Sequence, residues 1–137
     1  MKMTPRSALY MPASNQRAMD KARGLPADAI IFDLEDAVAP DAKDSARAQV
    51  VAQLAAGGYG ARQLVVRCND LSTPWGRDDL QAVAAAPGLH TVCLPKVEST
   101  GQLQAVTDLL NACGRSDMAI WAMIETPAGI ANSEQIA

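Results

Sequence analysis

Short apolar runs alternate along the chain with longer segments in which apolar residues recur every three or four positions. The apolar runs, each typical of a β-strand, cover residues 7–11, 29–32, 64–66, 91–94 and 119–124. Helix-like patterns lie between them, over residues 15–23, about 41–56 and about 77–86, then after a Ser99–Gln102 capping pair, and again after Pro127. The pattern therefore predicts a strand–helix unit repeated five times, with the fifth helix scarcely begun.

Such alternation is typical of parallel strands joined by right-handed helical crossovers. The predicted strands begin near residues 7, 29, 63, 90 and 119, an average spacing of 28 residues. Eight units at this spacing need about 224 residues, close to the roughly 250 of a closed (β/α)8 barrel. A doubly wound open sheet of five strands fits the length equally well. The pattern alone leaves both α/β folds open, and strand order distinguishes them: a barrel requires the order 1-2-3-4-5.

Composition narrows the functional classes. The 137 residues are 49% hydrophobic and carry 12 Lys and Arg against 15 Asp and Glu, a net charge of -3. This balance speaks against a nucleic-acid partner, and no apolar run approaches the roughly 20 residues that span a bilayer. The first residues, MKMTPRS, precede no apolar segment, so we expect no secretory signal. We expect Cys68, Cys93 and Cys113 to be buried thiols in a cytoplasmic protein.

Charged residues follow four of the five predicted strands. Glu35 and Asp36 come after the second strand, Arg67 ends the third, Lys96 follows the fourth and Glu125 follows the fifth. The carboxyl ends of parallel strands share one edge, where functional residues of α/β folds gather. Because charges are costly to bury unless paired or metal-bound, the set predicts a divalent cation, preferably Mg2+, and an anionic substrate. The alternative is that these are solvated loop residues.

The chain also resembles a known family in five motifs. They are RSALYMPA at residues 6–13, IFDLEDAV at 31–38, VRCN at 66–69, LPKVES at 94–99 and IETPAGI at 124–130. In this order they resemble the opening of the citrate lyase β-subunit-like branch of the HpcH/HpaI aldolases. The resemblance implies a TIM-type (β/α)8 barrel, with residues 1–137 as the N-terminal portion of its single domain, ending before strand six.

The resemblance further implies a Mg2+-dependent carbon–carbon lyase that cleaves a β-hydroxyacyl-CoA, such as a malyl-, citramalyl- or citryl-type thioester, through an enolate. On this basis Glu125 is the metal-binding carboxylate and Arg67 holds a carboxylate or carbonyl oxygen of the substrate. Glu35 and Asp36 match an acidic pair near the metal that binds its waters.

Two further basic residues are candidates on the same resemblance. Lys96 could orient Glu35, and Arg6 could contact the substrate or a phosphate of CoA; ion pairs with a purely structural role are the alternative. The family's second metal-binding aspartate lies in a stretch beyond the fifth strand, which these residues do not include. The resemblance also implies a homo-oligomer, a trimer or hexamer, in the full-length form.

Two other functions remain open at this point. One is an aldolase that acts on free 4-hydroxy-2-oxo acids, although the motifs around residues 6–13 and 33–38 favour the CoA-using branch. The other is an inert fragment or partner subunit. Nucleophilic Ser-His-Asp or Cys-His catalysis is excluded, because the only histidine, His90, is expected at the beginning of a strand, away from the carboxyl-end rim.

Overall fold

Five parallel strands form one sheet in the order in which they occur along the chain. The computed structural model describes residues 4–137. Within them the strands are β1 (Ala8–Pro12), β2 (Ala29–Asp33), β3 (Gln63–Arg67), β4 (Thr91–Leu94) and β5 (Ala119–Ala122). Each strand pairs in parallel with the next, giving the order β1-β2-β3-β4-β5. The sequential order predicted for the barrel family is confirmed, and the doubly wound alternative, whose order reverses around an interior β1, is wrong.

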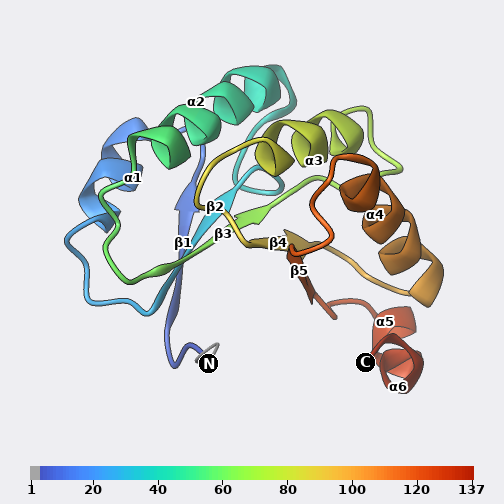
Figure 1. The fold of residues 1–137 in the computed structure, drawn as a ribbon. Helices are drawn as coiled ribbons and strands as arrows, with labels where there is room; N and C mark the ends of the chain where they lie inside the picture. The colour runs from blue at the N-terminus through green and yellow to red at the C-terminus, as the bar shows by residue number, and fades with distance from the viewer. Residues whose placement is uncertain (1–3) are drawn as a thin grey trace.

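Helices connect the strands and lie in succession on one side of the sheet. Figure 1 shows this arrangement for the first four α-helices. The helical elements are α1 (Gln16–Ala22), the 3-10 turn η1 (Pro40–Ala42), α2 (Lys43–Ala56), α3 (Gly76–Ala84), α4 (Thr100–Ala112), α5 (Pro127–Ala131) and α6 (Ser133–Ile136). Among residues 4–137, none of these helices combines the length and the apolar character that crossing a bilayer requires.

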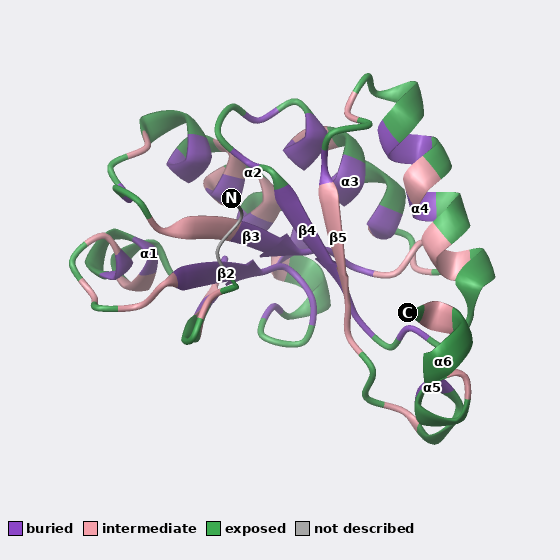
Figure 2. Ribbon diagram, turned by 60° about the horizontal axis from the view of Figure 1, so that its bottom comes forward, coloured by how far each residue is buried: buried purple, intermediate pink, exposed green. Residues whose placement is uncertain are grey.

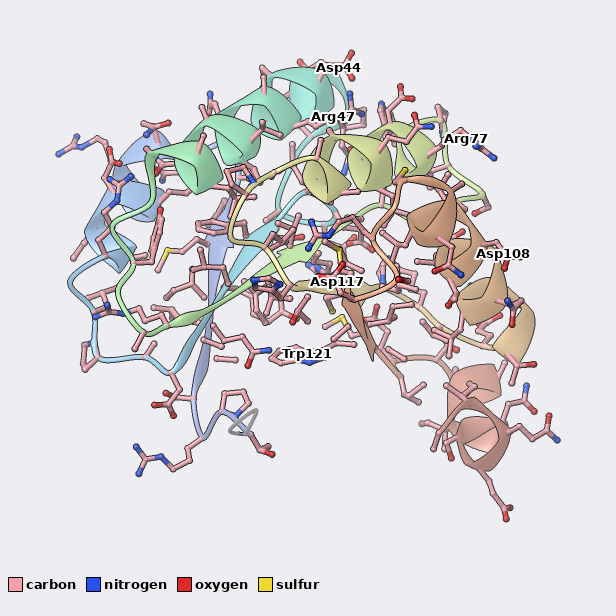
Figure 3. The ribbon with its side chains drawn as sticks, in the orientation of Figure 1. Asp44, Arg47, Arg77, Asp108, Asp117 and Trp121 are labelled. Carbon is pink, nitrogen blue, oxygen red and sulfur yellow. The ribbon has the colours of Figure 1, made fainter. Side chains whose placement is uncertain are left out.

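The core lies between the sheet and the helices. Successive side chains of a strand point to opposite faces, so Ile30 and Phe32 of β2 pack under the helices whereas Ile31 points the other way. Every residue of β2 is buried, as Figure 2 shows. On the face away from the helices, a smaller cluster joins Ile31 to Val65 and Cys93. Trp121, which is labelled in Figure 3, packs against this cluster. Both faces of the central strands are therefore apolar, as expected for a parallel sheet.

Most predicted elements are confirmed, with small shifts at their ends. The predicted capping box is present at the beginning of α4. The Ser99 side chain accepts the backbone N–H of Gln102, and the Gln102 side chain accepts the backbone N–H of Ser99. The prediction for Cys113 is wrong: this residue is exposed, whereas Cys68 and Cys93 are buried. The reason is the helix end, because α4 stops at Ala112 and Cys113 is its C-cap, outside the buried stripe.

Candidate active site at the carboxyl ends of the strands

A buried ion pair joins the last residues of β2 and β3. Asp33 and Arg67 are register partners in the sheet. The guanidinium donates from Nε to Asp33 Oδ1 (2.8 Å) and from Nη2 to Oδ2 (2.6 Å), and both side chains are more than nine-tenths buried. These hydrogen bonds raise the pKa of Arg67 above its ordinary value, so the guanidinium stays charged. The pair fixes a positive charge at the carboxyl ends of the strands.

Asp33 also holds the loop that follows β2. Its carboxylate accepts the backbone N–H of Glu35 (2.9 Å) and that of Ala37 (3.1 Å). Neither contact was predicted from the sequence, where only Glu35 and Asp36 were candidates after the second strand. The sequence does show that Asp33 and Arg67 each follow a predicted strand, but pairing them requires the strand register that the structure provides.

Glu35 points from this loop toward Arg67. Its Oε2 lies 3.8 Å from Arg67 Nη2, is buried, and has no hydrogen-bond partner among residues 4–137. Burial raises the pKa of Glu35, although contact with Lys96 opposes the shift. The pKa of the more exposed Asp36 is lowered, chiefly by a hydrogen bond with Glu35. A buried carboxylate oxygen without a donor is costly, so this atom is suited to bind a cation or a bound water.

Lys96 connects these carboxylates to Glu125. Its ammonium contacts Glu35 and lies 3.5 Å from Asp36 Oδ1, while its backbone N–H donates to Glu125 Oε1 (2.8 Å). The contact with Glu35 raises the pKa of Lys96. Lys96 has a φ of 50° and is the one non-glycine residue with positive φ among residues 4–137. Such a backbone costs on the order of 1 kcal/mol and persists where surrounding contacts require it.

The loop after β2 is supported from below by Lys43 of α2. The buried ammonium donates to the carbonyl oxygens of Leu34 (2.8 Å) and Glu35 (2.6 Å), and burial lowers the pKa of Lys43. Asn69, just after β3, donates from Nδ2 to the same Leu34 oxygen (3.0 Å). These contacts could not be predicted from the sequence, because they depend on how α2 packs beneath the loop.

Arg6 is not among the residues that the structure brings together at this rim. It precedes β1, at the opposite end of the strands, and its largely exposed side chain lies 3.5 Å from Asp28 Oδ2. His90 lies at the same end, as predicted, with Nδ1 3.5 Å from Asp117 Oδ2. Arg6, Asp28 and His90 line an open cavity of about 990 Å3. The position of Arg6 therefore gives no support to a role in binding substrate.

The carboxylate oxygens at the rim suit magnesium better than a metal whose ligands all come from protein side chains. Among the described residues, no three His, Cys, Asp or Glu side chains gather closely enough to hold a metal ion. Magnesium usually takes only one or two carboxylates, with water and substrate oxygens completing its shell. The unpartnered Oε2 of Glu35 and the carboxylate of Glu125, both adjoining Lys96, are donors of this type.

Comparison with known proteins shows the family to which the chain belongs. The HpcH/HpaI aldolase/citrate lyase family model matches residues 6–137. A (3S)-malyl-CoA thioesterase from Cereibacter sphaeroides is 48% identical over 132 residues, which are 96% of this chain and 44% of that protein. Citrate lyase subunit beta from Haemophilus influenzae is 40% identical over 138 residues, 96% of this chain and 47% of its own length.

A solved structure from the same group of proteins is similar to this chain over most of its length. The citrate lyase beta subunit of M. tuberculosis, complexed with oxaloacetate and magnesium, has a TM-score of 0.74 and 30% identity, covering 94% of this chain and 51% of its own. The chain thus spans about half the length of the relatives that it matches. On its sequence motifs, strand order and similarity to these proteins, the chain belongs to the HpcH/HpaI aldolase/citrate lyase family.

Proposed function

We propose that this chain forms part of a Mg2+-dependent carbon–carbon lyase that cleaves a β-hydroxyacyl-CoA into a shorter acyl-CoA and a 2-oxo acid. Relatives named for malyl-CoA and for citrate lyase support the substrate class, and the relative solved with oxaloacetate and magnesium supports the product class and the metal. The observation that carries the proposal is the fixed, charged Arg67 beside the unpartnered Oε2 of Glu35.

The cleavage requires stabilisation of negative charge. The bond between the thioester α-carbon and the hydroxyl-bearing carbon breaks, and its electron pair passes to the thioester as an enolate. The hydroxyl loses its proton as that carbon becomes the carbonyl of the oxo acid, and a proton later adds to the enolate carbon. Arg67 carries a full charge in a fixed orientation, so it stabilises a substrate oxygen at little reorganisation cost.

The carboxylates hold the cation in this proposal. Glu125 is the metal ligand, and the N–H of Lys96 fixes the orientation of its carboxylate. Glu35 and Asp36 bind waters of the metal, while the ammonium of Lys96 limits the repulsion between them. Magnesium, when bound, supplies a Lewis acid that polarises a substrate oxygen.

Hydrolysis of the thioester is a second candidate, favoured by the name of the 48%-identical relative. Cleavage of malyl-CoA yields an acyl-CoA and an oxo acid, whereas hydrolysis yields free CoA and malate. Chromatography of the CoA species separates the two outcomes. The aldolase alternative requires instead that a free 4-hydroxy-2-oxo acid is cleaved and malyl-CoA is not.

The test uses the complete gene product with malyl-CoA and MgCl2. We expect acyl-CoA formation that EDTA abolishes, and a loss of about a hundredfold or more in kcat/KM for Glu125→Gln and for Arg67→Lys. Glu98→Gln is the matched control, because Glu98 is an exposed carboxylate on the same loop as Lys96. Full activity of Glu125→Gln would overturn the assignment of Glu125 as the metal ligand. Absence of turnover with malyl-CoA and with 4-hydroxy-2-oxo acids would favour the hypothesis of an inert partner subunit.

A further inference from the structure

Two hydrogen-bond donors from different strands converge on one sulfur atom at the rim. Arg67 Nη1 lies 3.5 Å from Met123 Sδ, and the hydroxyl of Tyr10 lies 3.8 Å from the same atom. The Tyr10 ring lies over the guanidinium, with its centroid 5.1 Å from the guanidinium carbon. Tyr10 thus reaches from β1 across Arg67 of β3 to Met123, which directly follows β5.

A thioether is a poor partner for these donors. Sulfur accepts hydrogen bonds weakly, whereas a guanidinium N–H gains most from a charged oxygen. The other hydrogen-bonding edge of Arg67 is satisfied by Asp33, so Nη1 is the part of the guanidinium that remains under-satisfied. An oxygen anion in the place of the sulfur would accept from both Nη1 and the Tyr10 hydroxyl.

The side chain of Met123 can leave this place without moving the sheet. Its backbone is held by N–H donation to Leu94 O (2.9 Å) and by acceptance from Val97 N (3.0 Å). The methionine side chain is unbranched and has three rotatable bonds, so it adapts readily to a new neighbour. Displacement of Sδ by a ligand oxygen therefore requires only a rotamer change.

The Tyr10 hydroxyl is suited to donate at neutral pH. Burial, together with the neighbouring Cys93, Asp33 and Glu125, raises the pKa of Tyr10 above its ordinary value, although Arg67 opposes the shift. The phenol therefore stays protonated. The residue is nevertheless 40% exposed, so a ligand can reach it.

We propose that Tyr10 Oη and Arg67 Nη1 form a two-donor subsite for a carboxylate of the 2-oxo acid, and that Met123 Sδ occupies this subsite in the ligand-free protein. Tyr10 is then a substrate-binding residue contributed by β1. The inference rests on the proposed function, because it places the oxo-acid part of the substrate beside Arg67.

The test is calorimetric titration of the complete gene product with oxaloacetate in the presence of MgCl2. Tyr10→Phe keeps the ring over Arg67 and removes only the hydroxyl, so we expect affinity to fall about ten- to a hundredfold. Tyr59→Phe is the matched control: it removes the chain's other tyrosine hydroxyl, which donates to Met19 O on the helix side of the sheet, and affinity should not change. Met123→Leu removes the competing sulfur, so its affinity should equal or exceed that of the wild type.

A second measurement uses the unaltered protein. With 13C at the tyrosine ζ-carbon, the resonance that is missing in Tyr10→Phe should shift when oxaloacetate is added to the Mg2+-loaded protein, and not when Mg2+ is added alone. Equal affinity of Tyr10→Phe and wild type, or a loss in Met123→Leu as large as in Tyr10→Phe, would overturn the subsite. If the wild type binds neither oxaloacetate nor malyl-CoA, the proposed function itself fails; if it binds them and only Tyr10→Phe is unaffected, the subsite alone is wrong.

Discussion

Asp33 and Arg67 are register partners whose side chains meet through two parallel hydrogen bonds, of 2.8 and 2.6 Å, in a buried site. The same carboxylate accepts two backbone amides of the following loop, those of Glu35 and Ala37. One side chain thereby orients both the guanidinium of Arg67 and the loop that carries Glu35 and Asp36. The arrangement makes stability and site geometry depend on the same residue.

Removal of the Asp33 charge should therefore be costly. Asp33→Asn keeps the size of the side chain but leaves the buried guanidinium of Arg67 without its main counter-ion. We expect the free energy of unfolding to fall by about 3 kcal/mol, measured by urea denaturation. Asp44→Asn is the control, because Asp44 is largely exposed in its pair with Arg47, and this change should cost less than about 1 kcal/mol.

A double-mutant cycle tests whether the two side chains act as a pair. Asp33→Asn combined with Arg67→Met should destabilise the protein by less than the two single changes added together, because the second change removes the uncompensated charge. Simple additivity would contradict a direct Asp33–Arg67 interaction.

A second buried carboxylate supports the loop after β3. Arg47 of α2 donates from Nε to Asp79 Oδ1 (2.7 Å), and Asn69 donates to Asp79 Oδ2 from its backbone N (3.0 Å) and its side chain (2.6 Å). Figure 3 shows Arg47 beside α3, which carries Asp79. Asp79→Ala removes the acceptor of three hydrogen bonds, one of them from the charged Arg47, so we expect a loss of about 3–5 kcal/mol in unfolding free energy.

Asp78 provides the control for Asp79. Both lie in the first turn of α3, so their interactions with the helix dipole are similar, but Asp78 is exposed. Asp78→Ala should cost no more than about 1 kcal/mol. Comparable losses for the two variants in urea denaturation would show that the contacts of Asp79 contribute little.

Strand positions could be predicted because each strand is a short run of apolar residues between polar or glycine-rich segments. The gathering of Glu35, Arg67, Lys96 and Glu125 at one rim could also be predicted, because parallel strands end at a common edge. The contact between the Tyr10 hydroxyl and Met123 could not be predicted, since a tyrosine within an apolar run indicates packing and gives no sign of where its hydroxyl points.

The hydrogen-bond partners of the predicted residues could not be predicted either. The contact of Arg67 with Asp33 depends on a cross-strand register between residues 34 positions apart. Lys43 stabilises the loop at Leu34 only because α2 packs beneath it. Packing of this kind follows from the assembled core and has no local signature in the sequence.

Gly76 allows a close approach of two backbone segments. A Cβ at this position would lie 2.2 Å from the carbonyl oxygen of Asp70, and a backbone atom cannot yield as a side-chain end can. Gly76→Ala should therefore move the loop and destabilise the protein by about 1–3 kcal/mol in urea denaturation. Gly101→Ala is the matched change in α4, where the nearest atom is Ser99 Oγ at 3.7 Å; it should stabilise by up to about 1 kcal/mol. A neutral Gly76→Ala would mean that the loop relaxes freely.

Cys93 and Cys113 should differ sharply in reactivity. Burial raises the pKa of Cys93 from 9.0 to about 11, and its side chain is 3% exposed, whereas Cys113 is exposed. Because the folded state favours the neutral thiol, the contribution of Cys93 to stability is fully present below pH 9 and is lost as pH rises through about 11. Iodoacetamide at pH 8 should modify Cys113 and leave Cys93 intact, as read by peptide mass spectrometry, and urea-unfolded protein should be modified at both. If Cys93 in the folded protein were modified at pH 8 as fast as Cys113, the face of the sheet away from the helices would have to open to solvent.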